Sequence, residues 1–352
     1  MSKAGAEADK ATLRVPAQDM RALGMDILTA YGTSDNNAQI VVDHLIDASL
    51  RGLEAHGVMR FAEYAAQLEK GAIDGRATVN IRRSSPSAFK VDGQGGFGQV
   101  AMMTGVDLLR VAVAEQPMAA AAVVNVGHTG RIGAYAEMLA ASGCLGAVFG
   151  GGGHLKFPSV APFGGRRGVM STNPVAFAMP GRDDIPLSVD FATAASAGGK
   201  LRYARDNRLA LPEGQIVDRN GDPSTVPADY FDGGAILPLA GPKGTGMAAV
   251  AELLGYAMLG EAQEFNWFIQ ATRLSFFGNE QEYEDRARIF LDKIDACPPA
   301  RGFERVYYPG ELEKAKLDQG LSNGITVSGA VVKAIRDTCA KRSLTVPASM
   351  RA

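Results

Sequence analysis

The sequence contains few of the residues on which several protein classes depend. Its 352 residues include three cysteines, four histidines and one tryptophan. Cys144, Cys297 and Cys339 lie far apart without a C-x-x-C pair, so we expect buried thiols in a reducing, cytoplasmic environment. The histidines form no H-x-x-x-H or H-E-x-x-H pattern, so we expect no metal site.

Long runs of one kind of residue are also missing. There is no Lys/Arg block and the formal net charge is −2, so we expect no nucleic-acid partner. The longest apolar run, around MAAAAVVNV, is far shorter than the roughly 20 residues of a membrane span. The first residues lack the apolar segment of a signal peptide. We therefore expect a cytoplasmic protein with no membrane partner.

Helical and strand-like patterns divide the chain. Apolar spacing predicts three helices before Gly71, and AAAAVVNV, GHTGRIG, AYAEMLAASG and LGAVFGGGG predict a strand, a glycine loop, a helix and a strand. This order indicates an α/β core, followed by a buried helix at 244–259, a surface helix at 279–296 and a last helix at 325–342. We expect a flexible tail (1–12), a discontinuous helical, substrate-side lobe (13–117 with 285–352) and an α/β lobe (118–284).

Gly93, Gly95 and Gly98 spell G-x-G-x-x-G between a short apolar run and a helical pattern. A Rossmann turn also requires an acidic residue about 20 positions later, at the end of the next strand. The next strand ends in Asn125–Gly127 without a carboxylate. We therefore favour glycines that shape a tight strand-to-helix turn over a pyrophosphate-binding turn.

His56, Arg60 and Tyr64 are spaced i, i+4 and i+8, which predicts one shared helix face. A separate apolar stripe, Val58, Phe61, Ala65 and Leu68, is free to face the core. The first face would then line a cleft with a proton donor and an anion anchor. A chance cluster of surface residues is the alternative, and the pattern alone does not decide between them.

The remaining candidates are isolated residues. Lys243, in GPKGTG, lies where a helix begins and free N–H groups attract phosphate, although a solvated turn lysine fits equally well. His128 and His154 follow glycine loops, and both functional and structural roles stay open. We expect His44, in the middle of a helix beside two aspartates, to be an ordinary, partly exposed residue.

Several longer motifs occur in a fixed order: EAHGVMRFAEYAAQLEKGAI, DGQGGFGQ, GHTGRIGAYAEMLA, STNPVAFAMP, VDFATAASAGGK, LPEGQIVD, GGAILPLAGPKGTGMAAVAELL and YPGE. Together they resemble the second type of the malate/L-lactate dehydrogenase family over residues 15–345, with GRIG and YAE most similar to the hydroxycarboxylate dehydrogenases. The resemblance implies a non-Rossmann mixed sheet and an α/β lobe that binds NAD or NADP. It also implies a small carboxylate substrate and a homodimer or higher homo-oligomer.

The resemblance assigns roles to matched positions. It makes His56 the catalytic acid/base, Asp190 its partner and Arg60 the anchor of the substrate carboxylate, while Gly93–Gly98 become structural. The implied cofactor contacts are His128, Thr129, Gly130, Arg131, Thr172, Val189, Phe191, Lys243, Pro309, Gly310 and Glu311. Arg131, Arg166 and Arg167 are open as contacts of a 2′-phosphate or as surface charges. Ala55 departs from the serine of many relatives, which puts proton relay at that position in doubt.

The predicted reaction interconverts a 2-hydroxy acid and its 2-oxo acid by hydride transfer, with a histidine moving the proton. A reductase of a cyclic imino acid or a diketo sugar acid would need the same anchor and hydride donor. A non-catalytic nucleotide- or metabolite-binding protein is an alternative from another class. A metal-dependent hydrolase is a third, which the lack of a ligand pattern disfavours.

Overall fold

The computed structural model describes residues 12–351. Its centre is a seven-stranded sheet in which only the β3–β4 pair is parallel. The strands, in sheet order, are β2 (Asn80–Ser85), β3 (Ala88–Asp92), β4 (Met118–Val124), β11 (Asn266–Arg273), β5 (Cys144–Gly151), β6 (Pro174–Arg182) and β7 (Ile185–Ala192). The predicted α/β class with a mixed sheet is confirmed, and the strand order differs from a doubly wound parallel sheet.

Helices pack onto this sheet. α5 (Gly98–Ala112) and α6 (Gly133–Ala140) contact each other and share one apolar core with β3, β4, β5 and β11. α9 (Pro242–Glu252), continued by the π-helical turn η3 (Leu253–Ala257), contacts β5, and α10 (Glu280–Asp295) contacts β6. The expectation that α9 is a buried helix is wrong. Val250 and Leu253 are exposed at its end, because only a narrow stripe of Gly and Ala meets the sheet.

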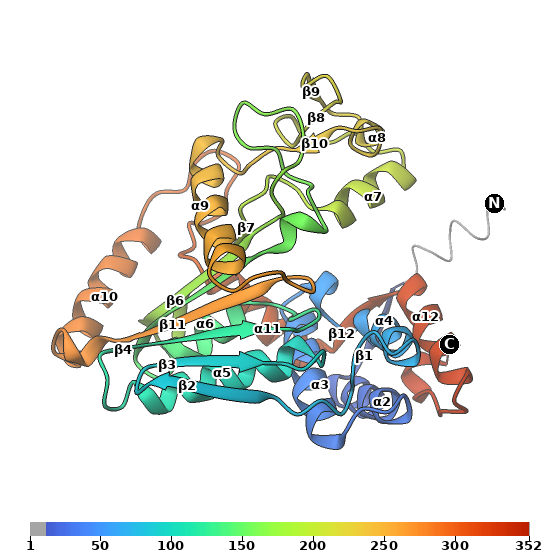
Figure 1. Ribbon diagram of the computed structural model, residues 1–352, viewed down its shortest axis with the longest axis horizontal. Helices are drawn as coiled ribbons and strands as arrows, with labels where there is room; N and C mark the ends of the chain where they lie inside the picture. Colours follow the sequence, from blue (N-terminus) through green and yellow to red (C-terminus); the bar gives the residue numbers. More distant parts are fainter. Residues whose placement is uncertain (1–11, 352) are drawn as a thin grey trace.

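The first and last segments of the chain form a second lobe with one core of its own. It contains β1 (Thr12–Val15), α2 (Ala17–Ala30), α3 (Asp35–Leu50), η1 (Glu54–His56), α4 (Arg60–Glu69), β12 (Ile325–Ser328), α12 (Gly329–Ala340) and η5 (Ala348–Met350). Figure 1 shows these blue and red segments together. The expected packing of the N-terminal helices against the C-terminal ones is confirmed. The single helix predicted at 325–342 is a strand followed by a helix, because β12 pairs with β1.

A third, smaller group lies at the top of Figure 1. It has its own apolar core and contains α7 (Gly198–Asp206), β8 (Ile216–Val217), β9 (Pro223–Ser224), α8 (Pro227–Phe231) and β10 (Ala235–Ile236). Three further elements complete the chain: η2 (Gly153–Leu155), η4 (Leu274–Phe276) and α11 (Glu311–Asn323), which packs on α3.

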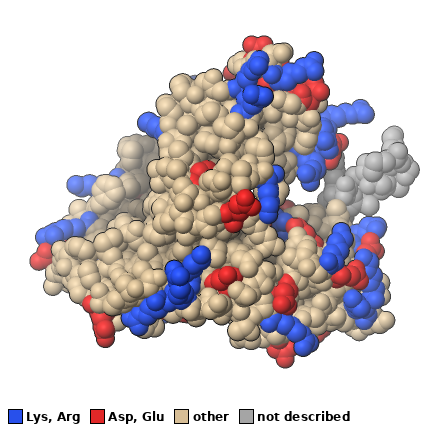
Figure 2. Space-filling view, viewed as in Figure 1, with Lys and Arg blue, Asp and Glu red and all other residues tan. Residues whose placement is uncertain are grey.

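The predicted lobe boundary at 117/118 stays a prediction, although β2, β3 and α5 before it belong to the sheet and its core. The predicted tail, residues 1–12, lies outside the described residues except for Thr12, which begins β1. Among residues 12–351, no helix has both the length and the apolar character needed to cross a membrane. Over the described residues visible in Figure 2, basic side chains alternate with acidic ones near the periphery, and the middle of this face is mostly uncharged.

One edge of the large sheet gathers the loops that matter for function. The register places the ends of β3, β4, β5 and β7 beside the starts of β6 and β11. The loops at this edge are 93–97, 125–132, 152–156, 171–173, 193–197 and 262–265. We call it the site edge. It meets the helical lobe where the 125–132 loop contacts η1, so residues from both lobes converge there.

Candidate active site

His56 and Arg60 do not lie on one continuous helix, contrary to the predicted shared face. His56 ends the 3₁₀ turn η1, and α4 begins at Arg60. Gly57 between them is extended, and a Cβ there would collide with Ser49 Oγ, which accepts a hydrogen bond from the Val58 N–H at 2.8 Å. The chain therefore turns sharply at Gly57 and brings His56 away from the helix axis.

The Arg60 side chain lies at the start of α4. Its Nε donates to Ala55 O at 2.7 Å, and its Nη1 pairs with Glu63 at 2.5 Å. Within residues 12–351, Nη2 makes no hydrogen bond or ion pair, so this part of the guanidinium fork is open to a ligand. The apolar stripe predicted on α4 is confirmed, since Val58, Phe61 and Ala65 are buried.

Tyr64 is fully buried and connects to His56 through a chain of hydrogen bonds. Gln99 Nε2 lies 2.8 Å from Tyr64 Oη, and Tyr64 Oη lies 2.7 Å from His128 Nδ1. His128 Nε2 lies 3.3 Å from His56 Nδ1, and the two rings stack with centroids 5.4 Å apart. The prediction that Tyr64 lines an open cleft is wrong, because its hydroxyl is needed inside this chain.

The backbone determines the direction of the hydrogen bonds. The Gly130 N–H lies 3.3 Å from His128 Nδ1, and a backbone N–H can only donate, so Nδ1 is an acceptor. The neutral His128 then carries its proton on Nε2 and donates it to His56 Nδ1. Neutral His56 in turn carries its own proton on Nε2. We assign these tautomers from the network of partners.

Burial keeps both imidazoles neutral near pH 7. Burial, together with the charges of Arg60 and Arg131, lowers the pKa of His56 to about 4. Burial, followed by the charge of Arg60, holds the pKa of His128 well below its usual range. A neutral His56 is able to accept the proton of a hydroxyl group.

His44 holds the loop that carries His128. Its Nε2 accepts a hydrogen bond from the Arg131 N–H at 2.9 Å, and its ring stacks on Tyr135. Tyr135 donates its hydroxyl proton to Thr129 O at 2.5 Å. Burial lowers the pKa of His44 to about 3. The expectation of a partly exposed His44 is wrong, and nothing in its local sequence indicates this contact.

The Arg131 guanidinium is used inside the protein. Its side chain is 4% exposed and pairs with Glu137 at 2.7 Å and with Asp47 at 3.0 Å. It is therefore not open to a 2′-phosphate, and only the backbone of its loop can face a cofactor. Arg166 and Arg167 are exposed, and their role stays open.

Asp190 lies near the end of β7 at the site edge. Its Oδ2 accepts a hydrogen bond from the Gly133 N–H at 2.7 Å, in the first turn of α6, where backbone donors lack helical partners. Desolvation by the surrounding protein raises the pKa of Asp190 to about 6, although part of the side chain is exposed to solvent. No hydrogen bond joins Asp190 to His56 within residues 12–351. In this structure His56 Nδ1 contacts His128 instead, and the pairing of His56 with Asp190 stays a prediction.

The other predicted cofactor contacts lie around the same edge. Thr172 O accepts the Thr193 N–H at 3.0 Å, and Val189 and Phe191 flank Asp190 on β7. The Pro309–Glu311 turn packs on β7 through the Ser188 N–H bond to Pro309 O, and a Cβ on Gly310 would collide with Pro186 O. Glu311 is buried in ion pairs with Arg182 and Arg305, which gives it a structural role.

Two observations fit a phosphorylated nucleotide near this edge. Lys243 is exposed in the first turn of α9, without a hydrogen bond or ion pair to any of residues 12–351. The 171–173 and 193–197 loops contain two buried oxygens, Asn173 Oδ1 and Ser196 Oγ, and neither has a hydrogen-bond partner within the described residues. Bound nucleotide groups would supply donors to these atoms. The described residues contain no group of His, Cys, Asp and Glu side chains suited to a metal ion.

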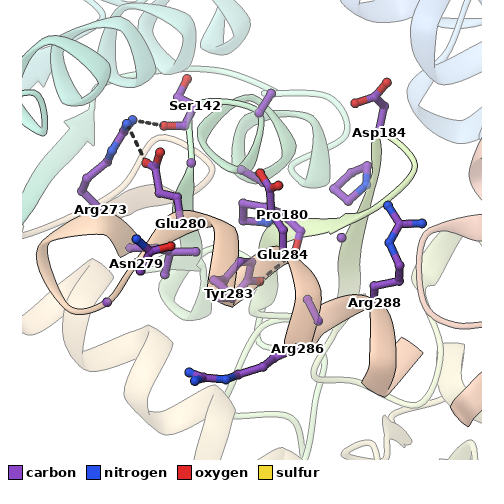
Figure 3. Close-up of a pocket in the computed structure, with 18 of the residues that line it drawn as sticks. Ser142, Pro180, Asp184, Arg273, Asn279, Glu280, Tyr283, Glu284, Arg286 and Arg288 are labelled. Atoms are coloured by element: carbon purple, nitrogen blue, oxygen red, sulfur yellow. Dashed lines mark hydrogen bonds and ion pairs between the residues drawn. The ribbon is translucent and has the colours of Figure 1, made fainter. Parts of the chain in front are cut away.

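A cavity of about 1100 Å³ lies elsewhere, between α6, the β6–β7 hairpin and α10. Figure 3 shows Arg273 and Tyr283 with their partners in its wall. Arg273 contacts Glu280 and Ser142, and the Tyr283 hydroxyl donates to Pro180 O. None of the predicted site residues lines it.

Comparison with known proteins identifies the family. Residues 15–336 match the model of the malate/L-lactate dehydrogenase family. The chain belongs to this family. The predicted membership and the predicted activity class, a 2-hydroxyacid dehydrogenase, are confirmed.

Three relatives illustrate the range of the family. L-sulfolactate dehydrogenase of Methanocaldococcus jannaschii is 30% identical, covering 94% of this chain and 97% of the relative. The solved structure of sulfolactate dehydrogenase from that organism has a TM-score of 0.86 at 29% identity, over 96% of this chain and 98% of the other. Hydroxycarboxylate dehydrogenase B of Escherichia coli O157:H7 is 35% identical over 70% of this chain and 68% of the relative. A Delta(1)-pyrroline-2-carboxylate/Delta(1)-piperideine-2-carboxylate reductase of Pseudomonas putida is 32% identical over 72% of this chain and 74% of the relative.

Proposed function

We propose that this dehydrogenase interconverts a small 2-hydroxycarboxylic acid and its 2-oxo acid with NAD or NADP, at the junction of His56, Arg60 and the site edge. The observation that carries the proposal is the neutral His56, which contacts His128, together with the Arg60 guanidinium, whose Nη2 makes no hydrogen bond or ion pair within residues 12–351. The nicotinamide, when bound, accepts or supplies the hydride. The residues of this chain hold the acid and move the proton.

His56 is the proposed acid/base. In oxidation, it takes the hydroxyl proton of the substrate while His128, Tyr64 and Gln99 keep its ring in place. Neutral His56 carries its proton on Nε2, so this proton must first move to Nδ1, with His128 changing to its other tautomer. The free Nε2 then takes the hydroxyl proton, and the imidazolium that forms releases a proton to solvent. In reduction, a proton from solvent first converts His56 to the imidazolium. The imidazolium then gives its Nε2 proton to the carbonyl oxygen and becomes neutral again.

Arg60 is the proposed anchor of the substrate carboxylate. A guanidinium binds a carboxylate through two parallel hydrogen bonds, which fixes the orientation of the neighbouring carbon. The contact with Glu63 occupies part of this fork, so a bound acid would compete with Glu63 or use Nη2. Holding the reacting carbon in this way is worth several kcal/mol of the barrier in oriented reactions.

The proposed cofactor contacts are the 128–131 loop through its backbone, Thr172, Val189, Phe191 and the Pro309–Gly310 turn, with Lys243 near a phosphate. Asn173 and Ser196 are additional candidates, because their buried oxygens have no partner. Asp190 stays a candidate catalytic partner. Its raised pKa and its place near the end of β7 support this role. Asp190 would take part in catalysis once bound ligands displace its hydrogen bond with the Gly133 N–H.

A cyclic imino acid is the second candidate substrate, favoured by the similarity to the pyrroline-2-carboxylate reductase. Arg60 would hold its carboxylate in the same way. We also propose a cytoplasmic homodimer or larger assembly. The three cysteines are free, which supports the compartment, although the expectation of buried thiols is wrong for Cys297, which is exposed. Exposed Ile289 and Phe290 on α10 support burial against a second copy.

The direct test is a substrate panel. NADH and NADPH oxidation are measured with pyruvate, oxaloacetate, hydroxypyruvate and a cyclic imino acid, for the wild type and for His56→Asn. We expect turnover of at least one 2-oxo acid and a loss of about 10²- to 10⁴-fold in kcat for His56→Asn, the usual size of an acid–base contribution. A folded His56→Asn variant with near-wild-type kcat would show that another residue moves the proton.

A further inference from the structure

Gln99 forms the inner end of the hydrogen-bond chain that reaches His56, and it lies in the first turn of α5. The side chains of Gln99 and Tyr64 are both fully buried. Gln99 Nε2 lies 2.8 Å from Tyr64 Oη, but the buried Oε1 of the same amide has no hydrogen-bond partner among the described residues. A buried amide oxygen without a donor costs free energy.

In the neutral chain, every hydrogen bond runs from Gln99 towards His56. Gln99 Nε2 donates to the Tyr64 oxygen, and the Tyr64 hydroxyl donates to His128 Nδ1. His128 Nε2 then donates to His56 Nδ1. The Gly130 N–H supports this direction, because it also needs an acceptor at His128 Nδ1. In this arrangement Gln99 uses only its donor.

Protonation of His56 reverses the direction of this chain. The imidazolium carries a proton on each nitrogen, so its Nδ1 donates to His128 Nε2. His128 must then carry its own proton on Nδ1 and donate it to the Tyr64 oxygen, 2.7 Å away. His128 and Tyr64 each keep one proton, so the only proton gained is the one on His56. The Tyr64 hydroxyl, turned away from His128, now needs an acceptor in the protein interior.

We propose that Gln99 is a positioning residue whose amide turns over when His56 is protonated, so that Oε1 accepts a hydrogen bond from the Tyr64 hydroxyl. The inference rests on the proposed function, in which His56 is the acid/base. A primary amide carries donors on one side and an acceptor on the other, so it can end the chain in either direction. Half a turn exchanges two atoms of nearly equal size. The reversal takes the acceptor from the Gly130 N–H, which favours the first direction while His56 is neutral.

The reversed chain supports a charge that the surroundings of His56 oppose. The titratable and charged groups around this ring are Arg60 and Tyr64 on α4, Arg131 and His128 on the 125–132 loop, and His44 on α3. The charges of Arg60 and Arg131 lower the pKa of His56, and within residues 12–351 no carboxylate bonds to its ring. Hydrogen bonds that support a charge are about twice as strong as neutral ones. A complete reversed chain therefore favours the imidazolium that proton transfer requires.

The kinetic test uses two substitutions of Gln99. Gln99→Met removes the donor and the acceptor at similar length, whereas Gln99→Glu keeps an oxygen that accepts in either protonation state. Val106→Ala is the matched control, because Val106 is buried on α5 in the core of the large sheet, outside the chain. Far-UV circular dichroism establishes that each variant folds.

Reduction of the 2-oxo acid is measured between pH 6 and pH 8. We expect Gln99→Met to lower kcat/KM about tenfold, mainly through kcat, because protonated His56 loses one charge-supporting hydrogen bond. Gln99→Glu and Val106→Ala should keep at least about a third of the wild-type value. An unchanged kcat/KM in Gln99→Met, or an equal fall in Val106→Ala, overturns the role of Gln99.

NMR of ¹⁵N-labelled histidine rings reads the tautomers directly, because a protonated ring nitrogen has a different chemical shift from an unprotonated one. Spectra are recorded between pH 8 and pH 4 and assigned with His56→Asn and His128→Asn. We expect the His128 proton on Nε2 at pH 8, moving towards Nδ1 as His56 gains its proton, and both changes should begin at a lower pH in Gln99→Met. A His128 that keeps its proton on Nε2 beside protonated His56, or identical titrations of Gln99→Met and the wild type, overturns the proposal.

The spectra do not depend on turnover, so they separate this proposal from the proposed function. If the wild type reduces neither a 2-oxo acid nor a cyclic imino acid, the proposed function fails, and the spectra alone decide whether Gln99 supports protonated His56. If an acid is reduced and Gln99→Met keeps the wild-type kcat/KM and titration, the proposed function stands and the role of Gln99 is refuted.

Discussion

Replacing His44 with glutamine tests whether this buried histidine stays neutral while it holds the 128–131 loop. Glutamine places an oxygen near the position of Nε2 and keeps an acceptor for the Arg131 N–H. It cannot gain a proton in the accessible pH range. The comparison with the wild type therefore isolates the titration of one imidazole, since the other ionisable groups are the same in both proteins.

The magnitude follows from the two pKa values. Burial lowers the pKa of His44 from 6.5 to about 3, so the unfolded state binds the proton more tightly than the folded state. The stability due to neutral His44 is complete above pH 6.5 and is lost as the pH falls towards 3. At pH 5 the unfolded state gains about 2 kcal/mol from protonation, while the folded state gains almost nothing.

Urea unfolding followed by circular dichroism at pH 8 and pH 5 measures this difference. We expect the wild type to lose about 2 kcal/mol more than His44→Gln over that interval. The pH 8 values report any packing cost of the substitution, and the pH 5 values add the protonation effect. Equal losses in both proteins would mean that His44 is protonated in the folded state at pH 5, and the proposed hydrogen bond to Arg131 would be refuted.

Three further substitutions test the site. Tyr64→Phe should lower the free energy of unfolding by about 1–3 kcal/mol, because the buried Gln99 amide loses its partner; urea unfolding measures it, and an unchanged stability would contradict the hydrogen-bond chain. For hydroxy-acid oxidation, kcat/KM should fall as the pH drops below an apparent pKa near 4, where His56 gains a proton. Arg60→Gln removes a positive charge that lowers this pKa, so the fall in kcat/KM should begin at a higher pH, although burial still lowers the pKa. An unchanged apparent pKa in Arg60→Gln argues against the charge effect. Lys243→Gln should raise the KM for the cofactor about tenfold with little change in kcat, as expected for a lost phosphate contact, and a KM that stays constant excludes that contact.

Local patterns were sufficient to predict most helices and strands. Ser34 caps α3 by accepting the Asn37 N–H, and the short apolar runs became the central strands β4 and β5. The strand β12 could not be predicted in this way. It has four residues, and its partner β1 lies more than 300 positions earlier in the chain. Only the folded arrangement brings that partner within reach.

The candidate site was predictable only in part, for the same reason. The motif around His56 indicated the acid/base and the anchor. The partner of His56 depends on contacts between distant segments, such as His128 with Tyr64 and His44 with the Arg131 N–H, and no periodicity in one sequence encodes them.

The glycines of the G-x-G-x-x-G segment allow close packing beside the candidate site. A Cβ on Gly93 would collide with Val126, and a Cβ on Gly98 would lie 2.7 Å from the backbone oxygens of Gly127 and His128. Both glycines therefore allow the start of α5 to pack directly against the loop that carries His128. The next residue after Gly98 is Gln99, whose amide donates to Tyr64 at the far end of the hydrogen-bond chain. The close approach that glycine permits thus brings Gln99 within reach of the residues that hold His56.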